Sequence, residues 1–217
     1  MKRMLMVFAL TLAVATMMAP VSASAALYTD RTAWEAAVGT FGSVDLPQAE
    51  YTTLASYASI GLPAGGFFNF DNPLQRLNYP TSWNTWNPSG STVELLYFNQ
   101  EATTLNASFY PDGVSGPISA FGFEAEPFVY GFYNISLYLA SGGQMIVQDV
   151  DGQGGAKFFG WAGEDVIGFS IWSETGSGGF AMGRFVEGTA VPEAGTMLLL
   201  GSGLVGLVGY RRMKRMN

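Results

Sequence analysis

Apolar side chains alternate with polar residues or glycine along much of the chain between residues 93 and 185. A period of two puts every second side chain on one face of an extended strand, so this pattern predicts β-strands rather than helices. Glycine-containing turns separate the runs at spacings of roughly 10–15 residues, as in antiparallel sheets. The alternating residues are Val93, Leu95 and Tyr97; Leu105, Ala107 and Phe109; Phe121 and Phe123; Ile135, Leu137 and Leu139; Met145 and Val147; Ile167, Phe169 and Ile171; Phe180, Met182 and Arg184.

Two segments do not show this two-residue alternation. Residues 27–39 predict one short helix, with Thr32 and Glu35 at the spacing of a capping box. Residues 51–90 are rich in Asn, Pro, Tyr and Trp and show no sustained period, which predicts long loops around one or two strands. The predicted fold is therefore mostly β: an antiparallel β-sandwich, jelly-roll-like, with one short N-terminal helix.

The chain contains no cysteine and no histidine. Disulfides, thiolate zinc sites, imidazole metal ligands and Ser-His-Asp triads are therefore excluded. Charge adds a further restriction, because residues 26–190 hold sixteen acidic and four basic residues, a net charge of -12. Such a surface repels phosphate backbones and argues against a nucleic-acid partner.

Residues 1–25 have the three parts of a secretory signal peptide. A basic pair at residues 2–3 precedes an apolar run over 4–18, and small residues at 23–25 form an A-x-A site that predicts cleavage after Ala25 or one residue later. The alternative is a retained anchor helix. The prediction is export, with signal peptidase as a partner.

The last 27 residues also have three parts. The motif Val191-Pro192-Glu193 comes first, and an apolar, glycine-rich segment follows over residues 197–210. This segment predicts a short transmembrane helix, since counting from Val191 gives about the length that spans a bilayer. The basic tail that ends it would stay in the cytoplasm; it consists of Arg211, Arg212, Lys214 and Arg215.

This layout resembles the PEP-CTERM sorting signal, in which an exosortase recognises a V-P-E-P motif and cleaves near it. The residues that carry the resemblance are Val191, Pro192 and Glu193, while the family's second proline is Ala194 here. The region from Phe121 to Phe185 is similar to a common domain type of the same proteins. The resemblance implies an exosortase as partner and an association with exopolysaccharide. An ordinary tail anchor that is never cut is the alternative.

Residues 78–91 place three aromatic residues among amides and hydroxyls: Tyr79, Trp83 and Trp86. Aromatic faces flanked by Asn suit sugar binding, because the ring stacks on CH groups while amides bond hydroxyls. We therefore expect these three residues to be partly exposed at one end of the sandwich as possible sugar contacts. The alternative, which we favour, is that these aromatic residues pack against the end of the sandwich.

Two pairs of acidic residues are candidate sites. Asp149 and Asp151 alternate after a strand and are weak candidates for calcium ligands, although a solvated turn is the simpler interpretation. Glu124 and Glu126 share one strand face, and a glycosidase needs two carboxylates across a cleft. No catalytic residue and no cofactor other than calcium is predicted.

The predicted organisation is a signal peptide over 1–25, a β-sandwich over 26–190 and a sorting signal over 191–217. The predicted function is that of a non-enzymatic surface or exopolysaccharide-matrix protein of a Gram-negative-type bacterium, held transiently in the inner membrane. A calcium-assisted carbohydrate-binding module is the alternative, and a glycoside hydrolase is a more remote one.

Overall fold

The computed structural model describes residues 26–86, 92–114, 116–129, 131–142, 144–151 and 155–190, with the backbone alone described for 144–151. The predicted signal peptide and sorting signal lie outside these residues. Within them the chain forms thirteen strands and one helix: β1 (Ala26–Tyr28), α2 (Arg31–Ala37), β2 (Val38–Ser43), β3 (Thr53–Leu54), β4 (Ile60–Gly61), β5 (Phe67–Phe70), β6 (Leu74–Tyr79), β7 (Val93–Phe98), β8 (Thr104–Tyr110), β9 (Ile118–Pro127), β10 (Phe132–Leu139), β11 (Gln144–Asp151), β12 (Lys157–Ser173) and β13 (Phe180–Ala190).

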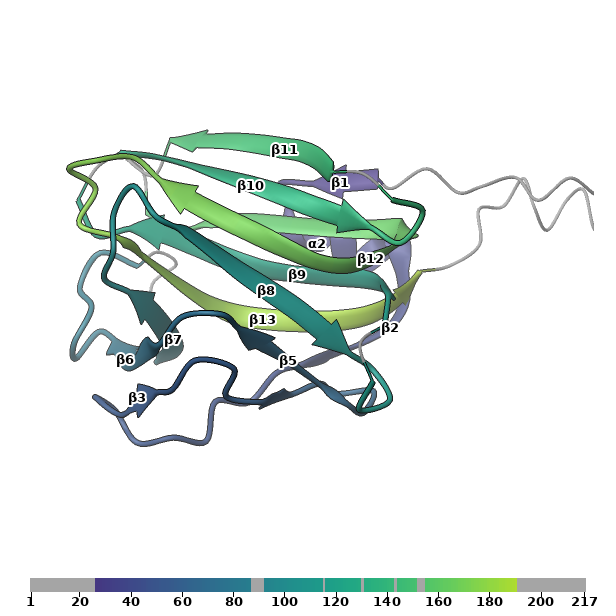
Figure 1. The fold of residues 1–217 in the computed structure, drawn as a ribbon, viewed down its shortest axis with the longest axis horizontal. Coiled ribbons are helices and arrows are strands. Elements are labelled where there is room, and N and C mark those ends of the chain that lie inside the picture. Colours follow the sequence, from purple (N-terminus) through teal and green to yellow (C-terminus); the bar gives the residue numbers. More distant parts are fainter. Residues whose placement is uncertain are drawn as a thin grey trace, which may run out of the picture. The chain divides into compact units, whose positions relative to one another are not determined.

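The strands pair antiparallel in the order β3-β6-β7-β13-β9-β12-β8-β5-β4. The two halves of strand β12 have different neighbours. Residues 157–162 pair with β9 and β1, whereas residues 166–173 pair with β8 and β10. Figure 1 shows β8, β9, β12 and β13 running diagonally across the domain. The mostly β, antiparallel prediction is confirmed.

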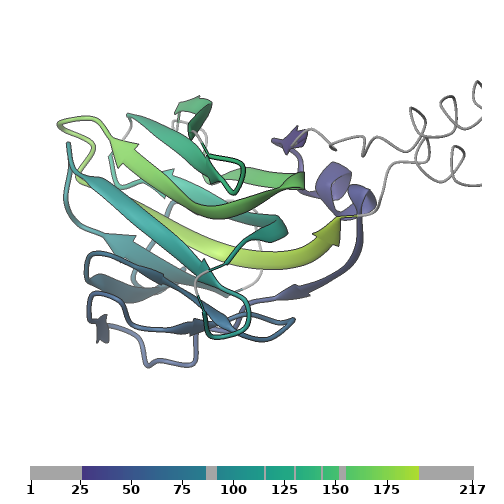
Figure 2. The ribbon, with the colours of Figure 1, turned by 45° about the vertical axis from the view of Figure 1, so that its right-hand side comes forward.

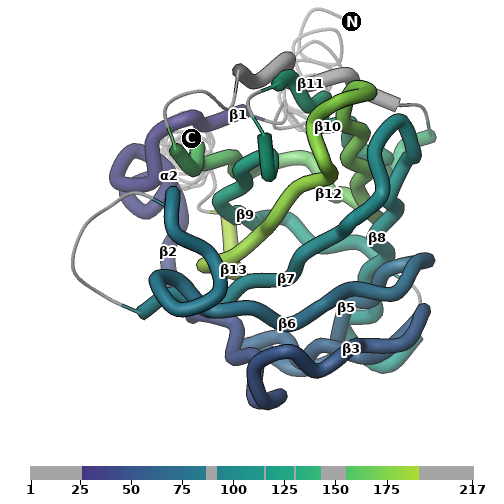
Figure 3. The backbone as a smooth tube through the Cα atoms, turned by 90° about the vertical axis from the view of Figure 1, so that its left-hand side faces the viewer, coloured from purple at the N-terminus to yellow at the C-terminus, as the bar shows by residue number. Residues whose placement is uncertain are grey.

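One hydrophobic core fills the space inside the curled sheet. Figure 3 shows the strands curling so that β5 approaches β6 and β3, and residues of all three strands belong to this core. Phe121 lies at its centre, with its ring centroid 5.1 Å from Phe109, 5.4 Å from Phe68 and 5.5 Å from Trp161. Leu105, Ala107 and Phe109 are also buried, and they alternate with less buried residues, so the alternation predicted for β8 is confirmed. Strand β9 is buried on both faces, because the residues on either side of Phe123 are buried too.

The helix α2 packs against β12 and lies at the right of the domain in Figure 2. Trp34 is fully buried, and its indole N–H donates to the carbonyl of Trp161 at 2.9 Å. A Cβ at Gly160 would lie 2.7 Å from the Trp34 ring, so the glycine makes room for the helix. Gly160 therefore faces the helix, whereas its neighbours Phe159 and Trp161 face the main core.

Two expectations about local structure were wrong. The helix is shorter than 27–39, and Asp30 caps it by accepting from the Ala33 N–H at 2.7 Å, so Thr32 does not begin a capping box. Strands β1 and β2 take up the flanking residues. Residues 51–90 contain four short strands, β3 to β6, instead of one or two, because two- to six-residue strands are too short to establish a period.

Candidate functional site

The aromatic residues predicted to contact sugar lie together, but two of them are buried. Trp83 and Trp86 are 4% and 1% exposed, whereas Tyr79 is half-buried. They pack with Leu77, Val93 and Leu95 in a small cluster separate from the main core. The expectation of partial exposure was therefore wrong for both tryptophans, and their contacts agree with the alternative of packing against the sandwich. A sugar contact through this group stays a prediction.

Trp83 also holds one of the acidic residues of β9. Its ring lies 5.4 Å from Tyr97 and 5.5 Å from Phe128, and its indole N–H donates to Glu126 at 3.2 Å. Burial raises the pKa of the Glu126 carboxyl, and the hydrogen bonds from Thr85 and Trp83 oppose that shift. Glu126 is thus a satisfied interior carboxylate beneath the tryptophan cluster.

Glu124 has a different set of partners. Its Oε1 accepts from Arg184 Nη1 at 2.9 Å and lies 3.5 Å from Arg31 Nη1. Arg184 has a φ of 51° and sits at a bulge in the pairing of β13 with β9, and such bulges redirect a side chain. The two glutamates therefore share a strand, as predicted, but belong to separate groups of contacts.

These two arginines line a hollow of about 220 Å³, together with residues of β2 and β7 and the segment that follows β2. The arginines are partly exposed, and both contact Glu124 beneath them. The pairs with Glu124 and Glu35 balance their charge. Sequence reasoning missed this arrangement, since its members are separated by up to 153 residues.

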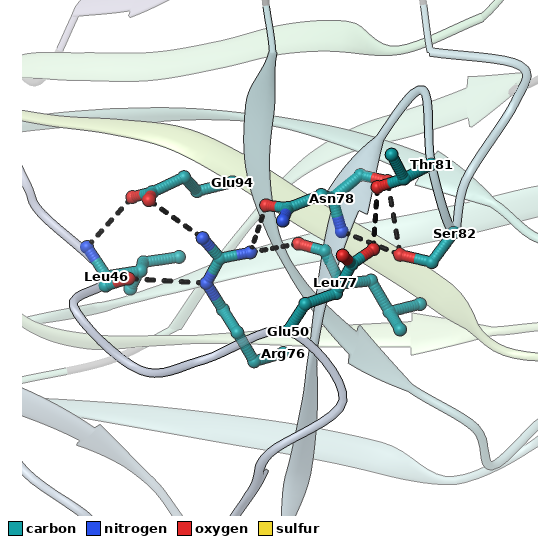
Figure 4. Close-up of polar contacts among 8 residues, drawn as sticks. All are labelled: Leu46, Glu50, Arg76, Leu77, Asn78, Thr81, Ser82 and Glu94. Atoms are coloured by element: carbon teal, nitrogen blue, oxygen red, sulfur yellow. Dashed lines mark hydrogen bonds and ion pairs between the residues drawn. The ribbon is translucent and has the colours of Figure 1, made fainter.

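A second network that sequence reasoning missed surrounds Arg76, which is 2% exposed (Figure 4). Its guanidinium donates to the carbonyls of Leu46 and Leu77 and to the Asn78 side chain, and it pairs with Glu94 at 2.8 Å. Glu94 in turn accepts from the Leu46 N–H at 3.1 Å. The network fastens the segment before β3 to strands β6 and β7.

A hollow of about 280 Å³ lies between β2, the end of β13 and the turn before β5. Glu187 is 6% exposed and accepts from the Ala64 N–H at 2.8 Å. Burial raises the pKa of the Glu187 carboxyl, against the effect of that hydrogen bond. Phe41 lines the same hollow and is 48% exposed. Neither residue was singled out from the sequence, because each is one of many similar residues in a β domain.

The calcium candidates lie on β11, opposite β10, where Asp149 pairs with Asn134 and Asp151 with Phe132. They belong to the strand itself instead of a turn after it. Their side chains lie outside the described part of the structure, so a calcium site there stays a prediction. Among the residues that the structure describes, no group of three or more His, Cys, Asp or Glu residues could hold a metal ion.

The sorting residues Val191, Pro192 and Glu193, the apolar segment and the basic tail all lie outside the described residues. In the part of the chain that the structure describes, no helix has both the length and the hydropathy needed to cross a membrane. The nearest described element is β13, whose last residue, Ala190, pairs with Val38 of β2. The folded domain thus extends to within one residue of the predicted motif.

Comparison with known proteins gave one match to a family and several structural similarities. No curated protein matches the chain. A variant of a family 29 carbohydrate binding module has 15% identity and a TM-score of 0.34, with 65% of this chain and 94% of that one covered. A second structure of family 29 has 9% identity and a TM-score of 0.35, with 70% and 89% covered. TM-scores this low do not establish a common fold or a common ligand.

The family match falls on the C-terminal segment. The model of the PEP-CTERM protein-sorting motif matches residues 190–214. This range contains the motif at 191–193, the apolar segment at 197–210 and most of the basic tail, in the order predicted from the sequence. The chain therefore carries a PEP-CTERM protein-sorting motif, the signal of an exported protein sorted by an exosortase.

Proposed function

We propose that this protein is a non-enzymatic component of the cell surface or exopolysaccharide matrix, exported through its N-terminal signal and processed by an exosortase. The observation that carries the proposal is the match of residues 190–214 to the sorting motif. The protein stays in the inner membrane only transiently, because cleavage near Glu193 separates the domain from the apolar segment. The organism is of the Gram-negative type in which such signals operate.

The position of the motif suits processing of a folded domain. Strand β13 pairs with β7, β9 and β2, and it ends at Ala190, directly before Val191. A cut in or after the motif therefore removes no strand of the sheet. The released product would keep the complete core that residues 26–190 build.

A structural or binding role agrees with the state of the interior carboxylates. Glu124 Oε1 is paired with Arg184, while its buried Oε2 has no donor among the described residues, and Glu126 accepts from an indole N–H. The chain supplies no histidine or cysteine to act as a base or a nucleophile. We assign the domain to adhesion within the polysaccharide matrix.

Binding to exopolysaccharide is tested by a pull-down of the full chain on polysaccharide from the host, with and without a calcium chelator. We expect retention that the chelator does not change. Retention that is lost with chelator would favour the calcium-assisted carbohydrate-binding module, with Asp149 and Asp151 as its ligands. Release of reducing sugar by the wild type, lost in both Glu124→Gln and Glu126→Gln, would contradict the non-enzymatic assignment.

A further inference from the structure

Four neighbouring strand segments of the sheet contain no charged residue. Strands β10, β8 and β5 and residues 166–173 of β12 pair side by side, and Figure 1 shows β10, β12 and β8 next to one another. None of their residues is Asp, Glu, Lys or Arg, although residues 26–190 hold sixteen acidic and four basic residues. A layer without charge in so acidic a domain favours an uncharged ligand over an ionic one.

The side chains of this layer alternate between the main core and the opposite, outward face. Ile135, Phe169 and Ala107 belong to the core, and successive side chains of a strand point to opposite faces. The residues between them therefore point outward, and residues that pair directly across strands share that face. The outward polar residues that stay partly or fully exposed are Asn134, Thr104, Asn106 and Ser108.

Trp172 is the accessible aromatic residue among the tryptophans of the chain. It pairs with Asn134 on one side and with Thr104 on the other, so an amide and a hydroxyl flank its ring on the outward face. It is partly exposed, whereas the other four tryptophans are buried: Trp34, Trp83, Trp86 and Trp161. A ring that stacks on CH groups beside groups that bond hydroxyls has the chemistry of a sugar contact.

Tyr138 adds a second ring on the same face. Its hydroxyl donates to Asn106 Oδ1 at 3.2 Å, and Asn106 donates from its side-chain and backbone nitrogens to Asp71 at 2.6 and 2.9 Å. A ring held in this way loses little freedom when a ligand stacks on it. Tyr138 pairs with Gly168, four residues along β12 from Trp172, which is about 14 Å along the strands. An oligosaccharide can contact both rings, whereas a single sugar cannot.

We propose that this outward face binds a neutral polysaccharide, with sugar rings stacked on Trp172 and Tyr138. Asn134 lies beside the first ring, and Ser108 lies across Gly168 from the second, so each ring has a polar neighbour for sugar hydroxyls. The site deepens the proposed function and rests on it for the biological source of the glycan. Acidic polysaccharides are disfavoured, because these strands supply no cation and the domain carries a net charge of -12.

Binding is tested by affinity electrophoresis of the full chain, in a neutral detergent, through gels that contain a neutral glucan, a neutral galactomannan or alginate. We expect retardation by at least one neutral polymer and none by alginate at equal ionic strength. Trp172→Ala should weaken the affinity by about tenfold and Tyr138→Ala severalfold. Trp172→Phe should keep most of the affinity, because a smaller ring can still stack.

The fluorescence of Trp172 gives a direct readout of the same site. Because the other four tryptophans are buried, a neutral quencher such as acrylamide should act mainly on Trp172. The polymer that retards the wild type should protect this accessible part of the emission. Trp172→Phe should remove the accessible part without polymer present. A purely structural role for Trp172 would give no protection.

Phe41→Ala is the matched control, because Phe41 is 48% exposed and lies on β2, which pairs with β13. It should leave retardation unchanged, and thermal unfolding shows whether each variant is folded. The proposal is overturned if no neutral polymer retards the wild type, if alginate retards it equally, or if the wild type forms a dimer that Trp172→Ala abolishes. Equal binding by folded Trp172→Ala and Phe41→Ala also overturns it, but leaves adhesion to the matrix in place through another surface.

Discussion

Replacing Glu193 with Ala is expected to leave most of the exported protein in its precursor form. On the proposal that an exosortase recognises this carboxylate, its removal leaves the donors that would bind it in the enzyme unpaired. A lost hydrogen bond of this kind costs on the order of 1.5–3 kcal/mol, which slows recognition by about tenfold or more. A pulse-chase of precursor and mature bands, in a host with its own exosortase, measures the effect.

The neighbouring position provides the matched variant. Ala194 stands where the family has its second proline, so Ala194→Pro should speed maturation. Proline restricts the unbound peptide to an extended form and reduces the ordering cost of docking by roughly 0.4–1 kcal/mol. The two substitutions should act in opposite directions, with the larger effect at Glu193. Maturation of Glu193→Ala at the parental rate would mean that the motif is not read and that the apolar segment is only an anchor.

Replacing Arg76 with Met is expected to cause the largest loss of stability among single substitutions of charged residues in the domain. Methionine fills much of the same volume but removes the guanidinium donors to the carbonyls of Leu46 and Leu77 and to the Asn78 side chain. Two lost hydrogen bonds to buried carbonyls, at about 1–3 kcal/mol each, lower the free energy of unfolding by roughly 2–6 kcal/mol. Urea unfolding followed by tryptophan fluorescence measures the change.

Glu94→Gln is the control for this network. The Glu94 side chain is 47% exposed, so water screens its pair with Arg76, and an amide oxygen can still accept from the guanidinium. The expected loss is no more than about 1 kcal/mol. Equal losses in both variants would contradict the view that the buried carbonyls, and not the ion pair, make Arg76 important.

The sequence predicted those parts of the molecule whose signal is contiguous. The sorting motif and the alternation of Phe121 and Phe123 occupy short windows, and each window contains its own evidence. The helix was also predicted, but its start was misplaced because Asp30 and Thr32 are both good caps and only the fold selects between them. Local periodicity therefore located the elements more accurately than their boundaries.

The parts that were missed depend on pairs distant in sequence. Trp83 and Trp86 lie in a segment rich in Asn and Pro. That composition predicts a loop, but it does not show whether the two rings pack inside the domain, as they do in the structure. Phe41 and Glu187 line one hollow only because β2 pairs with the end of β13. No window of the sequence contains both residues, so the hollow they line could be recognised only from the structure.

Mass spectrometry of the exported protein tests the central claim most directly, because it reads both ends of the same molecule. The mature chain should begin at Ala26 or Leu27 and should lack the residues that follow the region of Val191, Pro192 and Glu193. Such a product would show that the signal peptide and the sorting motif had both been processed. A surface-located form that still ends at Asn217 would contradict exosortase sorting and leave the C-terminal segment as a tail anchor.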